Sequence, residues 1–292
     1  MHFDVPGLAL PEEGLCRELR ELAIEVAIEA GRFVRDERPA SVDVRSTKAS
    51  DLDVVTIMDT QCEALLRARI LAERSDDAIL GEEGGTTGGS SGLTWVLDPI
   101  DGTVNYLYDI PAYAVSVAVV AGDPSMDGAW TPVAGAVFNP GVDEIFDAHR
   151  GGGARLAPAG PSTFPRPRTL IAPEPESLAR ALVGTGFSYD TARRREQGLV
   201  ATALLPQIRD LRRMGAASLD LCAVAAGRLN GYYERGLQPW DMAAGALIAV
   251  EAGALVSGLD GPASAESIVA APPGVHADLR VAISDALQDA RA

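Results

Sequence analysis

The sequence of 292 residues predicts an α/β protein built from layers of helices and sheets. Three observations lead to this fold class. An amphipathic helical pattern opens the chain, short strand-like runs separated by turn residues follow between residues 95 and 148, and strands alternate with helices after residue 167. Because each such element has an apolar face to bury, this succession favours packing in layers.

The first half of the chain is expected to place two helices beside a mainly antiparallel sheet. Apolar residues recur at helical spacing from Leu15 to Arg38, where Pro39 ends the pattern, and a second helix is predicted from about Thr56 to Glu73. Residues 84–92, GGTTGGSSG, are expected to form a surface loop. The predicted strands are residues 78–80, 95–97, 115–120, 133–138 and 144–148.

A proline-rich segment near the middle of the chain, residues 157–167, predicts a hinge between two halves. We expect an N-terminal half, residues 1–156, that carries most of the functional acids, and a C-terminal half, residues 157–292, within one compact catalytic unit. The elements predicted beyond the hinge are strands at 170–171, 183–187 and 231–234, helices at 178–182, 193–205, 218–226 and 242–251, two further strands, and a closing helix to 290.

The charge of the chain restricts its partners. Its 25 basic and 41 acidic residues give a formal net charge of -16 and a pI of about 4.6. Such a protein repels a phosphate backbone, so we expect no nucleic-acid partner. An anionic substrate remains possible where divalent cations reverse the local field.

The cysteines and the apolar segments indicate a reducing, cytoplasmic setting. Cys16, Cys62 and Cys222 are odd in number and widely spaced, which argues against a disulfide framework or a structural zinc site. The first 14 residues, MHFDVPGLALPEEG, do not have the pattern of a secretory signal. No apolar stretch approaches the ~18 residues that a membrane span requires, so we expect no membrane association.

The most informative stretch runs from Trp95 to Asn105, WVLDPIDGTVN. A buried strand ends at Asp98, and a Pro-Ile turn leads to Asp101, so both carboxylates can converge on one hard cation. The amides of Gly102 and Thr103 would open a helix, where unpaired N–H groups favour a phosphate. The alternative interpretation is that the two aspartates only shape a turn and cap a helix.

Other acidic groups also indicate a cation site, although each has an alternative, purely structural interpretation. Glu82 and its neighbour Glu83 end a strand and could be a solvated pair, and Asp241 precedes an apolar helix and could be its N-cap. Lys48 and Asp59 lie in a polar stretch before a helix. Taken together, several carboxylates at separate element ends, a single lysine and a threonine hydroxyl form the set that a multi-magnesium site requires.

Two other kinds of site have little support. Cys222 and Arg228 have the Cys-x5-Arg spacing of cysteine phosphatases, but the residues between them are apolar and helical, which favours core packing. No P-loop motif is present. The three histidines, at positions 2, 149 and 276, lie outside every acidic cluster, so histidine catalysis is not expected.

These motifs resemble those of the inositol monophosphatase family of magnesium-dependent, lithium-sensitive phosphatases. Three of them occur in the family's order, Gly81–Glu83, Trp95–Asn105 and Trp240–Gly245. The resemblance extends from Lys48 to Gly253, and it is closest to bacterial members of the actinobacterial type. It implies an αβαβα sandwich with mixed and antiparallel sheets, and a homodimer.

The resemblance also implies roles for individual residues. Glu82, Asp98 and the Ile100 carbonyl would bind one magnesium ion, Asp98, Asp101 and Asp241 a second, and Glu82 with waters a third, weaker ion. Asp59 and Thr103 would activate the attacking water. The residues that would face the substrate are Lys48, the amides of Gly102 and Thr103, Asp101, Gly215, Ala216, Ala217, Glu234 and Asp241.

We therefore expect a cytoplasmic phosphomonoesterase that uses Mg²⁺, or Mn²⁺ in its place, to hydrolyse inositol 1-phosphate. The same chemistry on histidinol phosphate, a 3'-phosphoadenosine nucleotide or fructose 1,6-bisphosphate is the nearest alternative. A regulatory binding role is the alternative from another class, and a complete set of acidic ligands argues against it.

Overall fold

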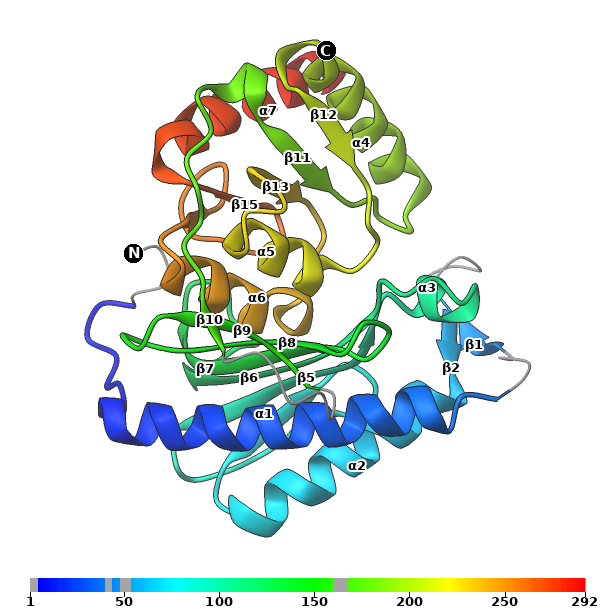
Figure 1. Cartoon of the computed structure of the whole chain (residues 1–292), viewed down its shortest axis with the longest axis vertical. Coiled ribbons are helices and arrows are strands. Elements are labelled where there is room, and N and C mark those ends of the chain that lie inside the picture. The colour runs from blue at the N-terminus through cyan, green and yellow to red at the C-terminus, as the bar shows by residue number, and fades with distance from the viewer. Residues whose placement is uncertain (1–4, 40–43, 48–53, 160–166, 292) are drawn as a thin grey trace.

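The computed structural model describes residues 5–39, 44–47, 54–159 and 167–291. Its long helices are α1 (Glu13–Asp36), α2 (Ile57–Glu73), α4 (Thr191–Leu204), α5 (Ala217–Ala225), α6 (Pro239–Glu251) and α7 (Pro273–Arg291). Helices α1 and α2 cover one face of a first sheet, α5 and α6 lie between it and a second sheet, and α4 and α7 cover the far face (Figure 1). The layered αβαβα prediction is therefore confirmed.

The first sheet has eight strands. They are β3 (Ala78–Gly81), β4 (Gly85–Thr87), β5 (Leu93–Asp101), β6 (Ala114–Gly122), β7 (Trp130–Asn139), β8 (Glu144–His149), β9 (Ala154–Pro158) and β10 (Arg168–Thr169). Their spatial order is β10-β9-β8-β7-β6-β5-β3-β4, and only the β3–β5 pair is parallel. The mainly antiparallel sheet is as predicted. The expected loop at 84–92 is partly wrong, because residues 85–87 turn back and pair with β3.

The second sheet has five strands, β11 (Leu182–Thr185), β12 (Asp210–Arg212), β13 (Gly231–Glu234), β14 (Leu255–Ser257) and β15 (Ile268–Ala271). Strand β11 runs parallel to both β12 and β13, whereas β15 is antiparallel to β13 and β14. The sheet is therefore mixed. Strand β11 ends two residues before the predicted end at 187, and β12 was not expected.

Shorter elements complete the described chain. Strands β1 (Val44–Thr47) and β2 (Val54–Thr56) form a two-stranded ribbon, and helix α3 (Thr103–Leu107) follows β5. Single 3-10 turns η1 (Leu178–Arg180) and η2 (Leu205–Gln207) flank the second sheet. The helix expected at 178–182 is thus only one 3-10 turn. The hinge predicted at 157–167 is wrong at residues 157–158, which belong to β9, and residues 160–166 lie outside the described residues.

Side-chain size explains how tightly the middle layer packs. Helices α5 and α6 are rich in alanine and almost fully buried. A Cβ at Gly245 of α6 would lie 2.8 Å from the Leu221 Cβ of α5, so glycine is needed for this approach.

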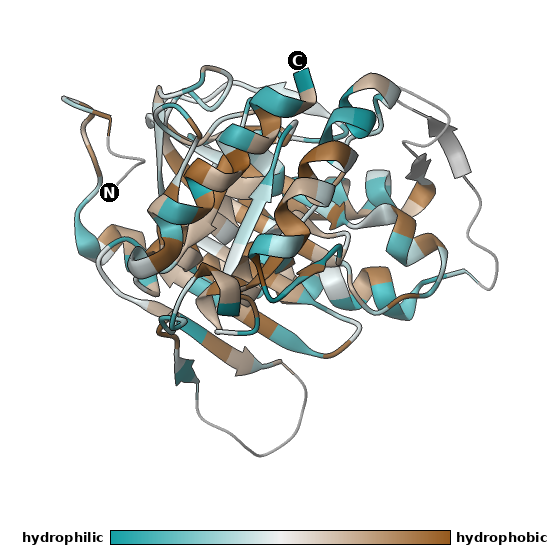
Figure 2. Ribbon diagram, turned by 90° about the horizontal axis from the view of Figure 1, so that it is seen from above, coloured by the Kyte–Doolittle hydropathy of each residue, from teal (hydrophilic) through white to brown (hydrophobic). Residues whose placement is uncertain are grey.

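Helix α7 buries one face, and the helices nearest the viewer in Figure 2 alternate teal and brown accordingly. Across the described ranges, no helix has both the length and the apolar character to cross a bilayer.

Candidate active site

A cavity of about 410 Å³ opens between the end of β5 and the second sheet. Its wall brings together nearly all of the residues predicted from the sequence. They are Glu82, Asp98, Ile100, Asp101, Gly102, Thr103, Gly215, Ala216, Ala217, Glu234 and Asp241. Asp59 lies behind this wall, within hydrogen-bonding distance of Thr103. Lys48 lies outside the described residues.

The turn after the buried strand β5 positions the first two aspartates. Pairing between β5 and β6 shifts register between Asp98 and Asp101, so the intervening Pro-Ile forms an irregularity in the strand. The Asp98 Oδ1 accepts a hydrogen bond from the Ile100 N–H at 3.1 Å. At Gly102, φ is +89°, and a Cβ there would lie 2.9 Å from the Ala112 carbonyl oxygen. Only glycine allows the chain to turn here into α3.

A second local device holds Asp59. Thr56 is the N-cap of α2 and Asp59 is its N3 residue, and their side chains and backbones form a capping box. The Asp59 Oδ2 accepts from the Thr56 N–H at 2.8 Å, and its Oδ1 lies 3.3 Å from the Thr103 hydroxyl. Burial raises the pKa of Asp59 to about 6, against the opposing effect of the Thr56 hydrogen bonds. This carboxylate is therefore ionised at neutral pH and can accept a proton.

The same device recurs at Asp241. Helix α6 begins at Pro239 with Gln238 as N-cap, and Asp241 occupies N3 of another capping box. Its Oδ2 accepts from the Gln238 N–H at 2.6 Å. The alternative that Asp241 is itself an N-cap is therefore wrong. Desolvation and the charges of Glu82 and Asp101 raise its pKa well above the usual value.

Asp101 links the two halves of the chain. Its carboxylate accepts hydrogen bonds from the Ser218 N–H at 2.8 Å, the Ala217 N–H at 3.2 Å and the Ser218 hydroxyl. These donors stabilise the ionised form, but burial outweighs them and raises the pKa of Asp101 to about 6. No role was predicted for Ser218, which follows the predicted residues at 215–217.

The turn that carries Glu82 is organised by a buried acid of α2. The Glu63 side chain accepts hydrogen bonds from the N–H groups of Glu83 and Gly84, both at 2.8 Å, and pairs with Arg67 at 2.8 Å. A Cβ at Gly81 would lie 2.4 Å from the Glu63 carboxyl group. The glycine therefore leaves the space that Glu63 fills, and Glu82 is placed on the cavity wall as a result.

The donor set of this wall fits a divalent cation. Glu82, Asp98, Asp101 and Asp241 all reach one cavity, and their mutual repulsion adds to desolvation in raising the pKa of Asp98 well above normal. Within the described chain, no three His, Cys, Asp or Glu side chains converge as a ready-formed metal site. Asp98, Asp101 and Asp241 each accept a hydrogen bond from a backbone N–H group. Oxygen ligands of this kind are those that Mg²⁺ and Mn²⁺ prefer.

Glu234, the last residue of β13, also lines the cavity. The Tyr232 hydroxyl donates a hydrogen bond to its Oε2. A Cβ at Gly186 would lie 1.9 Å from the same oxygen, so the glycine makes room for this carboxyl group. Desolvation raises the pKa of Glu234 to about 7, partly offset by Tyr232 and by the charge of Arg213.

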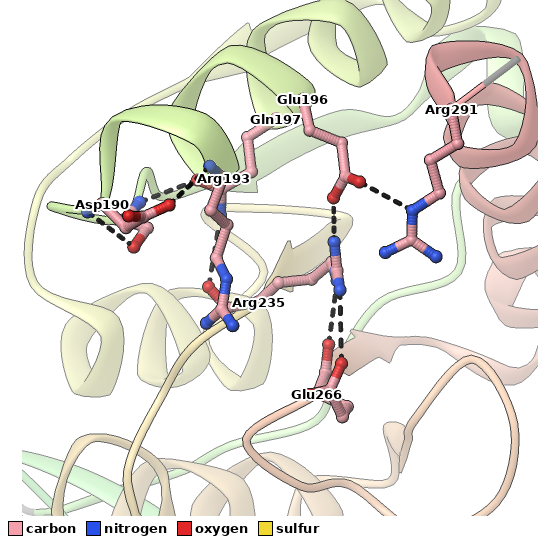
Figure 3. A network of polar contacts seen from close by, with 8 residues as sticks. Asp190, Arg193, Glu196, Gln197, Arg235, Glu266 and Arg291 are labelled. Atoms are coloured by element: carbon pink, nitrogen blue, oxygen red, sulfur yellow. Dashed lines mark hydrogen bonds and ion pairs between the residues drawn. The ribbon is translucent and has the colours of Figure 1, made fainter.

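A polar network supports the rim beside Glu234 (Figure 3). Arg235 pairs with Glu196 and with Glu266, and Glu196 also pairs with Arg291 of α7. The buried Gln197 accepts from the Ser188 N–H at 2.8 Å and donates to the Arg235 carbonyl at 3.2 Å. It therefore joins two segments of the cavity wall that are 47 positions apart. No sequence pattern indicated this contact.

Known proteins resemble this chain in sequence and in fold. The model of the inositol monophosphatase family matches residues 16–289. The chain belongs to this family. The family is one of phosphatases, and the match covers both sheets and every described residue of the cavity.

Individual relatives are similar over nearly their whole length. An inositol-1-monophosphatase SuhB of Mycobacterium tuberculosis is 43% identical over 283 residues, which is 91% of this chain and 93% of the relative. A solved structure titled Mycobacterium tuberculosis SuhB superimposes with a TM-score of 0.76 over 92% of this chain and 97% of that one. A protein of Vibrio cholerae named Nus factor SuhB is 36% identical, covering 89% of this chain and 93% of that protein.

Proposed function

We propose that this phosphatase hydrolyses the phosphomonoester of a small polyol, with inositol 1-phosphate as first choice and Mg²⁺ as cofactor. The proposal rests on one observation, that two parts of a single cavity wall differ in their chemistry. One part of its wall, here called the phosphate end, presents Glu82, Asp98, Asp101 and Asp241. Another part, here called the polyol end, presents Glu234 from β13. A phosphate bridged by cations suits the first, and ring hydroxyls suit the second.

Glu82, Asp98, the Ile100 carbonyl, Asp101 and Asp241 would hold two to three ions. Bound Mg²⁺, or Mn²⁺ in its place, would neutralise these acids and the substrate phosphate, which permits in-line attack by water. The amides of Gly102 and Thr103, with Lys48, would face the phosphate.

Asp59 and Thr103 would handle the proton of the attacking water. The Thr103 hydroxyl lies 3.0 Å from the Ile100 carbonyl oxygen and 3.3 Å from the Asp59 Oδ1. Water attacks phosphorus as the ester P–O bond breaks, its proton passes toward Asp59, and the leaving oxygen is protonated by solvent. This arrangement needs no covalent nucleophile, and none of the three cysteines, all buried, lines the cavity.

The substrate end would bind the polyol. Glu234 can accept two hydroxyl hydrogen bonds when it is ionised. Gly215, Ala216 and Ala217 lie beside it and would contact the ring with backbone groups.

Metal removal and substrate comparison test the proposal together. The purified protein is dialysed against EDTA and assayed on inositol 1-phosphate, histidinol phosphate, a 3'-phosphoadenosine nucleotide and fructose 1,6-bisphosphate, before and after Mg²⁺ is returned. We expect activity that is lost with the metal, restored by it, and highest on inositol 1-phosphate. A rate that EDTA leaves unchanged would refute the site, and a tenfold preference for histidinol phosphate would refute the substrate.

A regulatory binding role is the second candidate, since two relatives are named Nus factors. The net charge of -16 disfavours direct contact with RNA. Asp101→Asn separates the two roles, because it should remove turnover and leave a binding role intact.

The expected homodimer and cytoplasmic location are part of the same proposal. Light scattering during size-exclusion chromatography is expected to give about twice the 30.5 kDa chain mass. Inhibition by lithium is expected as for the family, and a lithium titration of the turnover rate measures it.

A further inference from the structure

Asp220 is a buried acid on the cavity wall that the proposed reaction does not use. It lies in the first turn of α5, its side chain is 2% exposed, and it is one of the residues that line the cavity. Its Oδ1 has no hydrogen-bond partner among the described residues, and no side-chain hydrogen bond of Asp220 occurs there.

Such an arrangement is unusual and requires a cause. The great majority of buried polar side chains have a hydrogen-bond partner, and a buried carboxyl group without one lowers the stability of the free protein. An acid in the first turn of a helix can be favourable, but that effect depends on solvation or on bonding to the helix N–H groups. Asp220 is 2% exposed and accepts no hydrogen bond from the described helix N–H groups, so helix stabilisation does not account for it.

The groups around Asp220 leave it without a protein partner. Tyr232 already donates its hydroxyl to Glu234, and both of these groups interact electrostatically with Asp220. Gly184 lies on another side, where even a Cβ would be 3.6 Å from the Oδ1. Burial and the charge of Glu234 raise the pKa of Asp220 well above normal, which favours a neutral carboxyl that can both donate and accept.

We propose that Asp220 is a further substrate-binding residue, which hydrogen-bonds a hydroxyl of the polyol beside the hydroxyls bound by Glu234. The inference rests on the proposed function and sharpens its substrate class. Two carboxyl groups, one from α5 and one from β13, would each hydrogen-bond one of two neighbouring hydroxyls on one ring. A phosphate ester without such hydroxyls gains nothing from Asp220.

Kinetics on two substrates test this role. Asp220→Ala and Asp220→Asn are compared with the parent on inositol 1-phosphate and on p-nitrophenyl phosphate, which lacks hydroxyls. Asp220→Ala should raise KM for inositol 1-phosphate about tenfold with kcat nearly unchanged, and should alter kcat/KM for p-nitrophenyl phosphate by less than twofold. Asp220→Asn, which resembles the neutral acid, should stay within about threefold of the parent.

A stability measurement distinguishes binding from a structural role. Because the free protein loses an unpartnered carboxyl group, Asp220→Ala should unfold at an unchanged or higher temperature without substrate. The matched control is Asp278→Ala, which makes the same change on the exposed side of α7.

The outcomes separate this inference from the function on which it rests. If Asp220→Ala lowers the rate equally on both substrates, or unfolds several degrees below the parent, Asp220 is structural and the inference is overturned while the phosphatase stands. If the parent hydrolyses p-nitrophenyl phosphate but no polyol phosphate, the substrate class and the inference fail together.

Discussion

The two ends of the cavity are built in different ways. At the phosphate end, Asp98 and Asp101 come from one turn, and Asp59 and Asp241 each sit at N3 of a capping box. At the polyol end, Glu234, Asp220 and Gly186 come from three separate elements or loops. Glu234 accepts a hydrogen bond from Tyr232, whereas the Asp220 Oδ1 has no partner among the described residues.

This difference separates chemistry from selectivity. The phosphate end should act on any phosphate ester that reaches it, because its groups face the reacting atoms. The polyol end should decide only which ester binds well. Substitutions at the phosphate end are therefore expected to slow the hydrolysis of all substrates alike. Those at the polyol end should weaken the binding of hydroxylated substrates alone.

The largest expected effect is that of Asp101→Asn. It removes a charge proposed to bind metal and should reduce kcat/KM about a thousandfold or more on both inositol 1-phosphate and p-nitrophenyl phosphate. Asp123→Asn, in the exposed turn after β6, provides the matched control and should be neutral. Substantial turnover by Asp101→Asn would show that the phosphate end is wrongly assigned.

Thr103→Val should have the next largest effect. Valine keeps the shape but removes the hydroxyl between Asp59 and the Ile100 carbonyl, so kcat should fall about a hundredfold on both substrates. Thr103→Ser keeps the hydroxyl and should retain most activity. A loss confined to KM, or to one substrate, would contradict the role in proton transfer.

Gly186→Ala should affect the polyol end alone. The new Cβ would meet the Glu234 carboxyl group, so KM for inositol 1-phosphate should rise about tenfold while p-nitrophenyl phosphate is hydrolysed as before. Gly198→Ala in α4, where nothing lies within 4 Å of the added Cβ, is the control. Equal losses on both substrates would mean that the two ends are not independent.

The smallest expected effect is a pH dependence of selectivity. Ionised Glu234 is a stronger hydrogen-bond acceptor than its protonated form, so the ratio of kcat/KM for inositol 1-phosphate to that for p-nitrophenyl phosphate should rise about threefold through pH 7. Glu234→Gln should make this ratio independent of pH. A wild-type ratio that is flat from pH 6 to pH 8 would contradict the prediction.

The raised pKa of Glu234 also predicts the direction in which the stability of the folded protein changes with pH. Because the pKa of Glu234 is raised from 4.5 to about 7 in the folded protein, its stabilising contribution is full below pH 4.5 and is lost as the pH rises through 7. Thermal unfolding of Glu234→Gln should therefore depend less on pH over this range than that of the parent.

Most of the fold could be predicted from periodicity. The pattern from Leu15 to Arg38 gave α1, and the runs between residues 95 and 148 gave four strands of the first sheet, because long amphipathic or alternating segments carry a strong signal. Strands β4 and β12 were missed, since each has three residues and owes its conformation to pairing with a neighbour.

The site residues, like the strands, fall into those that local sequence motifs predicted and those that they did not. Asp98, Asp101 and Asp241 were proposed from short motifs in which the acid follows a strand or precedes a helix. No role was predicted for Ser218, Asp220 or Gln197. Ser218 acts through its hydrogen bonds to Asp101, and Gln197 through those to Ser188 and Arg235, contacts that only the folded chain brings about.

What the sequence alone determined is the set of layers, the family resemblance, and the acids that local turns and helix starts present. Turn geometry and capping act within a few residues, so their result is written in the order of the chain. The tertiary structure alone decided that Glu234 and Asp220 line one cavity, with Gly186 leaving room for the Glu234 carboxyl group, and that Asp101 is bound by the start of α5. Those contacts depend on the close packing of α5 and α6 between two sheets, which no segment specifies by itself.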